Sequence, residues 1–491
     1  MPLSFTHEGG LALTPSERGE FLALVLNWLP GSTFYEGKGE RERRYLALLS
    51  SLLLHDPGFV ADLAAYSRQV LGLRTVGAYL VGALFLAGSE VSRRAGYPSE
   101  ARALALRAAR AVWRRGDEHL QTLGHLAYLG LPFPKLLRQA VRAHLEALPP
   151  HRLLKHRKAN PTSLSRAFSQ RDALRLLHPR PRDRTQEAVF RFLLGKATPE
   201  DRSLVEVLRG ERPTWEGLLS ARGNTQEAWR EALPHLGALA LVRNLRNLMA
   251  VGFTLQDLLP HAERAQVRDL YPHQLLQAYE ETPQALPLLD RLFYRMVEAR
   301  PPMDRTLVLL DLSGSMAGRP IRQAAPLAVA LALRGGAIVP FNHEVHPSLR
   351  LGESPLETLR GLVHRADGGT YLGRAVDHAA RMAAEEGFRR LVVLTDEQAH
   401  DDALLALRRF LEGDPHRQAH VVNLVGYRPT VASPHPRLYR HAGFSPRLLD
   451  SIPLVEGGGE AVRGYLERWE GEVGLGYGER EEVDGDDKAE V

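Results

Sequence analysis

The chain contains no cysteine and only 6 methionines among its 491 residues. Without cysteine it cannot form disulfides, a thiolate nucleophile or a zinc ribbon. Its longest apolar run, Val76 to Ala87, is shorter than the roughly 20 residues that a membrane-spanning helix needs. The amino terminus also lacks a basic region followed by an apolar core. We therefore expect no secretion and no membrane insertion, and a cytoplasmic location.

The composition is that of an ordinary soluble protein, with 44% hydrophobic and 25% charged residues. A chain of this length exceeds the size at which a single core usually splits, so we expect two or three domains. The net charge is +5, and arginine supplies most of the positive charge in many segments. Arginine binds phosphate bidentately through its planar fork. Its abundance, together with 32 prolines and few methionines, is equally typical of heat adaptation.

Residues 1–300 show a helical pattern. Apolar residues recur at spacings of three and four and are interrupted by Pro, Gly or His-Pro about every twenty residues. One helix is predicted from Glu17 to Trp28 and another from Glu40 to His55, each ending before a proline. A long series of short helices with almost no strand pattern predicts a HEAT-like solenoid, which can curve and close on itself.

Residues 301–470 change to alternating strands and helices, which predicts an α/β domain. Its last helix is expected from Glu460 to Trp469. Residues 471–491 are rich in glycine and acidic residues, and we expect a disordered tail. The predicted strands are Leu307 to Leu310, Ala337 to Phe341, Leu391 to Leu394 and Val421 to Val425, and the predicted helices are Arg322 to Leu333, Tyr371 to Glu386 and Asp401 to Glu412.

Oxygen-bearing side chains follow apolar runs at three places in this second part. Asp311, Ser313 and Ser315 alternate along the chain, so in an extended segment their side chains point the same way. Thr370 follows two glycines, and Asp396 ends another predicted strand. Ligands that are all oxygen suit a hard divalent cation rather than Zn²⁺. We predict a Mg²⁺ site, with Mn²⁺ or Ca²⁺ as alternatives.

This set resembles the metal-ion-dependent adhesion site of the von Willebrand factor A family, whose fold is a doubly wound (Rossmann-like) sheet. The resemblance implies that Ser313, Ser315 and Thr370 contact the metal directly. It also implies that Asp311 and Asp396 act through water, which leaves one position for a partner's carboxylate. The alternative is a serine-rich turn without metal. A phosphotransferase of the haloacid dehalogenase type is excluded, because it needs a second carboxylate where Ser313 stands.

The stretch from His151 to Arg184 is strongly basic, with ten Lys or Arg residues and two acidic residues. Such a density neutralises several phosphates and is typical of a nucleic-acid surface, while Phe168, His156 and His178 are candidates to stack on bases. The alternative is a basic face that docks against acidic neighbours. The candidate RNA-binding residues are Lys155, Arg157, Lys158, Arg166, Arg171, Arg175, His178, Arg180 and Arg182.

Two further groups of basic residues are weaker candidates. Arg243 and Arg246 each precede an asparagine at three-residue spacing, and we expect Asn244 and Asn247 to bridge neighbouring helices. A second group near the amino terminus is a candidate to line a central hole. Its members are Lys38, Arg41, Arg43 and Arg44.

The chain as a whole resembles the TROVE module of the Ro ribonucleoprotein family, which combines such helices with a carboxyl-terminal A domain. The matching segments are GSTFYEGKGE (31–40), SQRDALRLLHPRP (169–181), WREALPHLGALALVRNLRNLMAVG (229–252), DLSGSM (311–316) and HAGFSPRLLDSI (441–452).

The resemblance implies a ring of helical repeats that binds a small noncoding Y RNA outside and single-stranded 3′ ends of misfolded RNAs in its hole. His178 matches a functional histidine of the family. The family usually has Gly-Trp-Ser-His where this chain has Ala167, Phe168, Ser169 and Gln170. The details of Y RNA contact are therefore expected to differ here.

We expect a monomeric RNA-binding protein that is not an enzyme, because the sequence shows no HExxH motif, no Walker loop and no Ser-His-Asp order. Any processing of RNA would then need a partner 3′-to-5′ exoribonuclease. One alternative is a metal-dependent protein-interaction scaffold that binds no RNA. Another is a chelatase-type accessory protein of a separate ATPase. Steep salt dependence would favour RNA binding, and loss of binding with EDTA would favour the scaffold.

Overall fold

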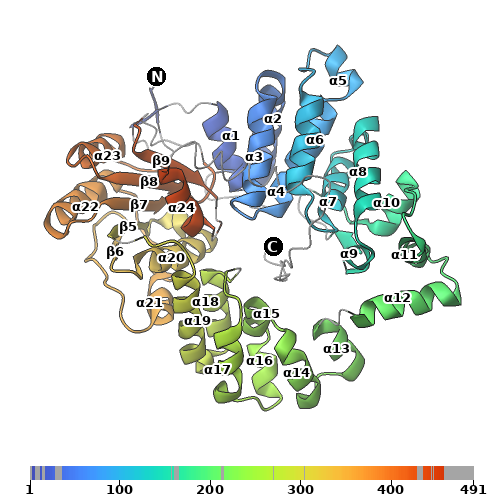
Figure 1. Cartoon of the computed structure of the whole chain (residues 1–491). Coiled ribbons are helices and arrows are strands. Elements are labelled where there is room, and N and C mark those ends of the chain that lie inside the picture. Colours follow the sequence, from blue (N-terminus) through green and yellow to red (C-terminus); the bar gives the residue numbers. More distant parts are fainter. Residues whose placement is uncertain are drawn as a thin grey trace.

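The helices follow one another around a ring that a sheet domain completes in the computed structural model (Figure 1). The structure describes residues 3–457 except 6–10, 14–16, 28–35, 156, 160–164, 212–214, 269, 304, 428–434, 444 and 446. A helical region comes first along the chain, and a parallel sheet with interleaved helices follows it. The predicted fold class, helical repeats followed by an A-type α/β domain, is confirmed.

The first arc of the ring consists of helices that pack on their neighbours. They are α1 (Glu17–Leu26), α2 (Lys38–His55), α3 (Pro57–Gln69), α4 (Arg74–Ala87), α5 (Glu90–Arg94), α6 (Ala101–Val112), α7 (Glu118–Tyr128) and α8 (Lys135–Ala147). The break between α2 and α3 has a local cause. Asp56 accepts a hydrogen bond from the Phe59 backbone N–H, and Pro57 occupies the first turn. Helix α4 is buried along almost its whole length, as its apolar sequence requires.

The next arc carries the basic stretch. It comprises α9 (Pro150–Lys155), β3 (Lys158–Ala159), β4 (Phe168–Ser169), α10 (Gln170–Leu177), α11 (Arg184–Leu194) and α12 (Pro199–Glu211). Strands β3 and β4 form a short antiparallel pair that packs on α7. Ser169 and Asp172 start α10 with reciprocal side-chain to backbone hydrogen bonds, so local sequence alone fixes this helix start.

The third arc leads to the sheet domain. Its elements are α13 (Trp215–Arg222), α14 (Gln226–Ala232), η1 (Leu233–His235), α15 (Ala238–Arg243), α16 (Leu245–Ala250), α17 (Leu255–Arg264), α18 (Pro272–Glu281), η2 (Pro283–Ala285) and α19 (Leu286–Glu298). Trp229 is fully buried and stacks on Trp215 at a centroid distance of 6.1 Å. Its indole N–H donates to Asn224 Oδ1 at 2.6 Å, so its one polar group is satisfied.

Five parallel strands form the sheet in the order β6-β5-β7-β8-β9. The strands are β5 (Thr306–Asp311), β6 (Ala337–Phe341), β7 (Arg390–Thr395), β8 (Gln418–Asn423) and β9 (Leu438–Ala442). The helices around them are η3 (Gly314–Met316), α20 (Arg319–Ala332), α21 (Pro355–Leu362), α22 (Leu372–Glu386), α23 (Ala403–Glu412) and α24 (Leu448–Glu456). Near the amino terminus β1 (Leu3–Phe5) pairs with β2 (Leu11–Leu13) in antiparallel fashion.

The two faces of this sheet belong to different cores. Leu307 and Leu309 of β5 face the core that α22 and α23 cover. Val308 and Leu310 face a second core, which includes α20 and continues without a break into the helical arcs. Side chains alternate along a strand, so one strand serves both cores. The core on one face of the sheet is therefore continuous with the core of the helical ring.

The ring closes where α1 meets the loops after β8 and β9, a contact that we call the seam. Asn27 Nδ2 donates to the Asn423 carbonyl oxygen at 2.6 Å, across 396 residues of sequence. Gly443 has a φ of +86°, and a Cβ at this position would overlap the Leu26 carbonyl oxygen. Glycine is thus required there both for its backbone conformation and for the close approach of α1.

Further hydrogen bonds hold the seam along its length. Ser445 Oγ donates to the Leu71 carbonyl, and Arg447 Nη1 donates to the Gln69 carbonyl at 3.3 Å. Arg44 Nη2 donates to the Gly426 carbonyl at 2.9 Å. Several backbone carbonyls that α-helices and loops leave unpaired are satisfied in this way. The structure therefore describes a closed ring.

The predicted helices and strands are observed close to their predicted ranges, and most of their ends differ by one to three residues. The helix predicted from Glu17 ends at Leu26, and α2 begins two residues before the predicted Glu40. The sequence missed β9, α21 and α24, whose segments are short or interrupted by proline. The helix predicted at 460–469 and the tail 471–491 lie outside the described residues. The domain boundary near residue 300 stays a prediction.

Among the described residues, no single helix is both long and apolar enough to cross a membrane. Helices α2 and α3 together reach the necessary length and composition, but they meet at an angle of 119°.

Candidate metal site and RNA-binding surface

The predicted metal ligands lie at the point where the sheet changes its winding direction. From β5 the chain moves to β6 on one side, and it later returns to β7 on the other side. The loops after β5 and β7 therefore diverge at the carboxyl-terminal edge of the sheet, which is where ligands bind in open α/β folds. The first loop carries Asp311, Ser313 and Ser315, and the other carries Asp396.

Backbone hydrogen bonds tie the three loops together at this edge. The Gly314 N–H donates to the Gly368 carbonyl at 2.8 Å, and the Asp367 N–H donates to the Leu312 carbonyl at 2.7 Å. These two bonds join the loop after β5 to the loop that precedes α22. That second loop contains Thr370, whose carbonyl accepts the His400 N–H of the loop after β7 at 2.8 Å, so the three loops meet at this edge.

The oxygens of the first loop are close together and buried. Ser313 Oγ and Ser315 Oγ lie 3.2 Å apart. The Asp311 carboxylate accepts hydrogen bonds from the Ser313 N–H at 2.8 Å and from Thr395 Oγ1 at 2.6 Å. These bonds orient Asp311 and leave the two serine hydroxyls beside each other. All five predicted ligands are buried, namely Asp311, Ser313, Ser315, Thr370 and Asp396.

The electrostatics of the site favour a cation. Burial raises the pKa of Asp311, and burial together with the nearby Asp311 charge raises the pKa of Asp396 to about 7. Asp396 Oδ1 accepts from the Gln398 N–H at 3.1 Å, whereas Asp396 Oδ2 is buried without a hydrogen-bond partner among the described residues. A divalent ion would relieve the repulsion between the two carboxylates and satisfy this oxygen. The residues present therefore fit a hard cation.

The part of the chain that the structure describes holds no group of three or more His, Cys, Asp or Glu side chains that could bind a metal. The candidate site differs from such groups because three of its five predicted ligands are hydroxyls. Sequence reasoning missed Thr395, which bonds Asp311, and Glu397, which follows Asp396 with a φ of 63°. It also missed His400, whose role is developed below. A polar residue after a buried strand was the available signal for Thr395.

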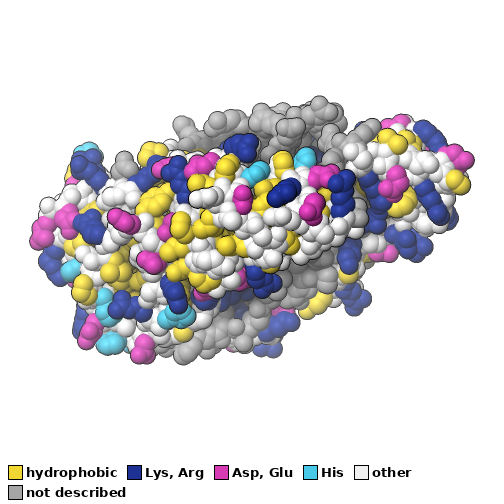
Figure 2. Space-filling model, turned by 90° about the horizontal axis from the view of Figure 1, so that it is seen from below, with side chains coloured by type: hydrophobic (Ala, Val, Ile, Leu, Met, Phe, Trp, Pro, Cys, Tyr) yellow, Lys and Arg dark blue, Asp and Glu magenta, His cyan; other side chains and the backbone are white. Residues whose placement is uncertain are grey.

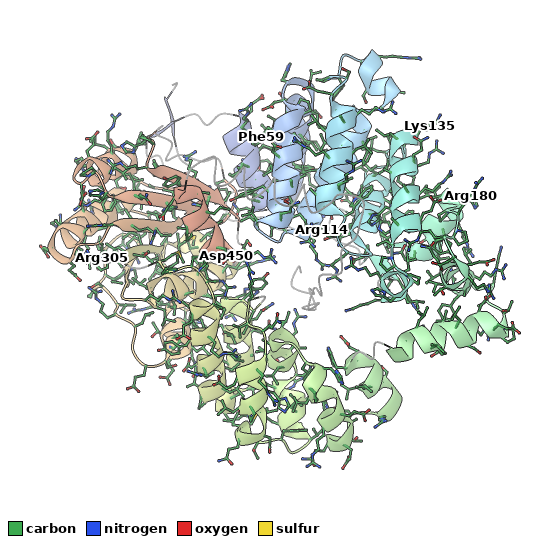
Figure 3. All side chains as sticks on the ribbon, in the orientation of Figure 1. Phe59, Arg114, Lys135, Arg180, Arg305 and Asp450 are labelled. Atoms are coloured by element: carbon green, nitrogen blue, oxygen red, sulfur yellow. The ribbon has the colours of Figure 1, made fainter. Side chains whose placement is uncertain are left out.

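The predicted RNA-binding residues lie on the surface of the second arc. Figure 3 shows Arg180 at the outer edge of the ring and Arg114 on the side that faces its middle. Lys158, Arg166 and Arg175 make no ion pair with a described carboxylate. Exposed side chains are found at all of the candidates, namely Lys155, Arg157, Lys158, Arg166, Arg171, Arg175, His178, Arg180 and Arg182.

Some of these residues also have structural contacts. Arg171 Nε donates to the Leu193 carbonyl at 2.8 Å, which ties α10 to α11. The Arg157 guanidinium lies over the Phe192 ring at 5.2 Å from its centroid. His178 ends α10 with a φ of 47° in the left-handed region. The backbone conformation of His178 is therefore set partly by its position at the end of α10.

The stacking role considered for Phe168 needs a correction, and His156 lies outside the described residues. Phe168 is half-buried and meets Phe133 edge to face, with a centroid distance of 6.1 Å. Gln170 is fully buried and donates to the Gly116 carbonyl at 2.5 Å. In this chain the residues that depart from the family pattern thus serve packing and the start of α10.

Arg184, at the end of the basic stretch, and two of the arginines that follow it differ from Lys158, Arg166 and Arg175 because they are paired. Arg184 and Arg191 both approach the buried Asp201, at 2.7 and 3.8 Å. Arg209 pairs with Glu206 at 2.7 Å. Figure 2 shows Lys and Arg side chains gathered toward the end of the ring face where α12 lies, interspersed with acidic side chains. The positive charge of Arg184, Arg191 and Arg209 is therefore largely neutralised, whereas no described carboxylate pairs with Lys158, Arg166 or Arg175.

The weaker candidates are mostly structural. Arg41 is buried, and Arg44 pairs with Glu36 at 2.7 Å while it also bonds the seam. The suggestion that these two residues line the hole is therefore corrected, because Arg44 holds α2 to the sheet domain and Arg41 Nη2 donates to the Asn27 carbonyl at 3.4 Å. Asn244, between α15 and α16, donates from Nδ2 to the Ala240 carbonyl at 2.8 Å, and its Oδ1 accepts from Asn247 Nδ2 at 3.2 Å. Both bonds stay within this local segment.

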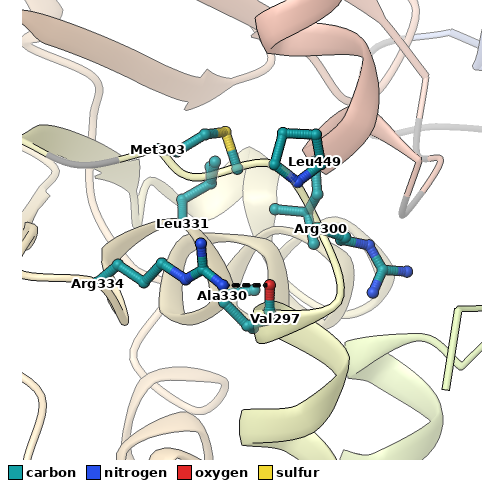
Figure 4. A pocket seen from close by; sticks show the side chains of 8 residues that line it. Val297, Arg300, Met303, Ala330, Leu331, Arg334 and Leu449 are labelled. Carbon is teal, nitrogen blue, oxygen red and sulfur yellow. Dashed lines mark hydrogen bonds between the residues drawn. The ribbon is translucent and has the colours of Figure 1, made fainter.

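A small recess opens where α19, α20 and α24 meet (Figure 4). Its lining is mostly apolar and includes Met303, Leu331 and Leu449. The two arginines at its edge are already engaged: Arg334 Nη2 donates to the Val297 carbonyl at 3.3 Å, and Arg300 bonds three backbone carbonyls. We interpret the recess as a packing feature of the junction between ring and sheet domain.

Comparison with models of protein families gives a match to part of the chain. A model of the TROVE domain matches residues 206–281, which run from the end of α12 to the end of α18. A search of curated proteins found no match. The match confirms the recognition of the TROVE family from the sequence, although it covers well under half of the chain. Proteins of this family bind RNA and are generally not catalytic. Residues 206–281 of the chain are therefore similar to a TROVE domain, a domain found in Ro-like RNA-binding proteins.

Proposed function

We propose that this protein is the core of a small ribonucleoprotein and binds a noncoding RNA of the Y type on the outer surface of its ring. The observation that carries this proposal is the unpaired basic surface of the second arc. Lys158, Arg166 and Arg175 are exposed and have no described carboxylate beside them, whereas the adjacent arginines of α11 and α12 are neutralised. Unpaired cations on a surface release counterions from a phosphate backbone when they bind it.

We further propose that the middle of the ring takes single-stranded 3′ ends of misfolded or structured RNAs. Helices surround this region on all sides in Figure 1, and Arg114 faces it in Figure 3. Contacts to phosphate and stacking on exposed rings would hold single strands with little sequence preference. Degradation of such RNAs would fall to a partner 3′-to-5′ exoribonuclease, with this protein presenting the substrate.

The proposal is tested by the RNA that accompanies the protein. The full chain is purified from its own cells, and the bound nucleic acid is extracted and sequenced. The variant carries three changes, Lys158→Ala, Arg166→Ala and Arg175→Ala. The control carries Arg360→Ala, Arg381→Ala and Arg389→Ala, which remove the same charge from exposed positions of the sheet domain. A dominant structured small RNA that only the first variant loses would support the proposal, and nucleic-acid-free wild-type protein would contradict it.

A second candidate function, metal-dependent binding of a protein partner, is favoured by the unpartnered Asp396 Oδ2. A Mg²⁺ ion held by Ser313, Ser315 and Thr370, with Asp311 and Asp396 around it, would supply an electrophilic position for a carboxylate of the partner. The two functions are separable. RNA binding should weaken steeply with salt and survive EDTA, whereas the metal-dependent contact should be lost with EDTA.

A further inference from the structure

We propose that His400 and Asp401 act as positioning residues for the metal site, and that His400 sets its metal affinity by fixing Thr370. Neither residue belongs to the predicted ligand set. Together they form a short segment, here called the clasp, that grips the chain from Thr370 to Arg374. The inference rests on the proposed metal site and deepens it.

His400 contacts Thr370 through two hydrogen bonds. The His400 backbone N–H donates to the Thr370 carbonyl at 2.8 Å, and the Thr370 N–H donates to His400 Nδ1 at 3.1 Å. Nδ1 also lies 3.2 Å from the Thr370 carbonyl, but it cannot donate and accept at once. The Thr370 N–H is a fixed donor that points at Nδ1, so Nδ1 acts as the acceptor in this contact. The backbone of Thr370 is therefore held on both sides by one residue.

The orientation of the His400 ring is fixed by stacking. The Tyr371 ring lies parallel to it, with a centroid distance of 5.3 Å and an interplanar angle of 7°. The Arg374 guanidinium lies over the Tyr371 ring at 4.5 Å from its centroid. These contacts limit rotation of the two rings and keep Nδ1 aimed at Thr370.

Asp401 extends the same grip to the start of α22. Its Oδ1 accepts from the Gly373 N–H at 2.8 Å, and its Oδ2 accepts from the Arg374 N–H at 2.9 Å. These N–H groups belong to the first turn of the helix, which has no internal acceptors for them. A carboxylate at this helix end is also favoured by the helix dipole. Asp401 thus anchors the downstream side of the Thr370 loop.

The glycine pair before Thr370 allows this close packing. Gly368 has a φ of +75°, and a Cβ there would overlap Nδ1 of His343. A Cβ on Gly369 would lie 2.9 Å from His400 Cε1. The loop therefore passes between two histidine rings, with space only for glycine.

The clasp couples ligands that come from different loops. Asp396 and His400 belong to one continuous segment after β7, and His400 binds the loop of Thr370. A shift of either loop would consequently change the distance between the Thr370 hydroxyl and the Asp396 carboxylate. Residues that orient metal ligands in this way usually change metal affinity by roughly 10- to 100-fold when they are replaced.

Two matched variants separate the acceptor from the ring. His400→Phe keeps a flat ring against Tyr371 but removes the acceptor, and His400→Asn places an amide oxygen near the position of Nδ1 but removes the stack. Mn²⁺ affinity of the full-length protein is measured by titration calorimetry and by the electron paramagnetic resonance spectrum of free Mn²⁺. We expect roughly 10- to 100-fold weaker Mn²⁺ binding in His400→Phe and near wild-type binding in His400→Asn. Asp377→Asn on α22 serves as a control with unchanged affinity.

Hydrogen exchange of the metal-free protein gives a readout that does not depend on the ion. The amide of Thr370 should exchange faster in His400→Phe than in wild type and should be protected again in His400→Asn. Equal Mn²⁺ affinity in wild type and His400→Phe would overturn the clasp while leaving the metal site intact. Wild-type protein that binds neither Mg²⁺ nor Mn²⁺ would overturn both. Unchanged Thr370 exchange in His400→Phe would also overturn the inference.

Discussion

The candidate metal site and the basic surface are built in opposite ways. The metal site brings together three loops that are far apart in sequence, buries their oxygens and ties them with backbone hydrogen bonds. The basic surface comes from one continuous stretch, is exposed and depends on local features such as the start of α10. Binding at a buried site of this kind should weaken sharply when a single ligand atom is lost. Binding at an exposed charged surface should weaken gradually with the number of charges removed.

The largest expected effect is that of Asp311→Asn on metal binding. The substitution keeps the size of the side chain but removes the charge that faces the cation and one acceptor of the hydrogen bonds from Ser313 and Thr395. Mn²⁺ affinity should fall by at least about 100-fold, more than replacement of an orienting residue produces. RNA affinity at constant salt should not change. A parallel loss of RNA binding, measured by filter binding, would show that the two sites do not act independently.

The triple variant Lys158→Ala, Arg166→Ala and Arg175→Ala should have the next largest effect. RNA affinity should fall at least about tenfold, and the slope of log K against log salt should decrease by about 2 to 3, since each lost phosphate contact contributes about 0.9. The measurement is a salt titration of RNA binding beside the sheet-domain control. Mn²⁺ affinity should stay at the wild-type value. An unchanged slope would mean that these side chains do not contact phosphate.

The pH dependence of metal binding should be about tenfold per unit below pH 7. The Asp396 carboxyl, with a pKa of about 7, holds its proton below that pH and must release it to face a cation. The stability of the metal-free protein should depend on pH with the opposite sign. A carboxyl whose folded pKa is raised contributes stability at low pH, and this contribution is lost as pH rises through 7. Titrations with Mn²⁺ at pH 6, 7 and 8 check the first statement, and denaturant unfolding of wild type and Asp396→Asn checks the second.

The smallest expected effect is that of Ser169→Ala at the start of α10. The hydroxyl accepts the Asp172 N–H at 3.2 Å, and losing such a cap costs about 1 kcal/mol. Because α10 carries Arg171 and Arg175, its fraying should weaken RNA binding by up to roughly fivefold, as about 1 kcal/mol implies. Circular dichroism and RNA titration test this. No change in RNA affinity would show that the surface does not depend on an ordered α10.

Much of the sheet domain was predictable from the sequence because its strands are apolar runs that end in polar residues. Ala337–Phe341 was predicted residue for residue, since both its ends adjoin glycine or asparagine. Strand β9 was missed because its segment, LYRHA, is half polar and is buried only through its neighbours. The ligands predicted after β5 and β7 lie together because parallel strands end at one edge, whereas Thr370 comes from the loop between α21 and α22.

Other contacts could not be read from the sequence. The pairing of His400 with Thr370 joins positions 30 residues apart, and neither residue type by itself signals a hydrogen bond to the other. The role of Arg44 at the seam depends on Gly426, which lies 382 residues away. Such contacts are set by how whole elements pack rather than by local pattern. For this reason some basic residues make structural contacts here, whereas others with similar sequence surroundings are exposed.

The seam also has a consequence for how the protein is made. Helix α1 leaves the ribosome early, but its partner Gly443 is synthesised more than 400 residues later, at roughly 5–20 residues per second. For roughly 20–80 seconds of each synthesis the nascent chain therefore has an open arc with no partner for its first helix. Once the seam has formed, an RNA with no free end can reach the middle of the ring only if the seam opens again. If RNA binds in the middle of the ring as proposed, the order of translation gives each molecule one period in which RNA can enter from the side instead of by threading an end through the hole.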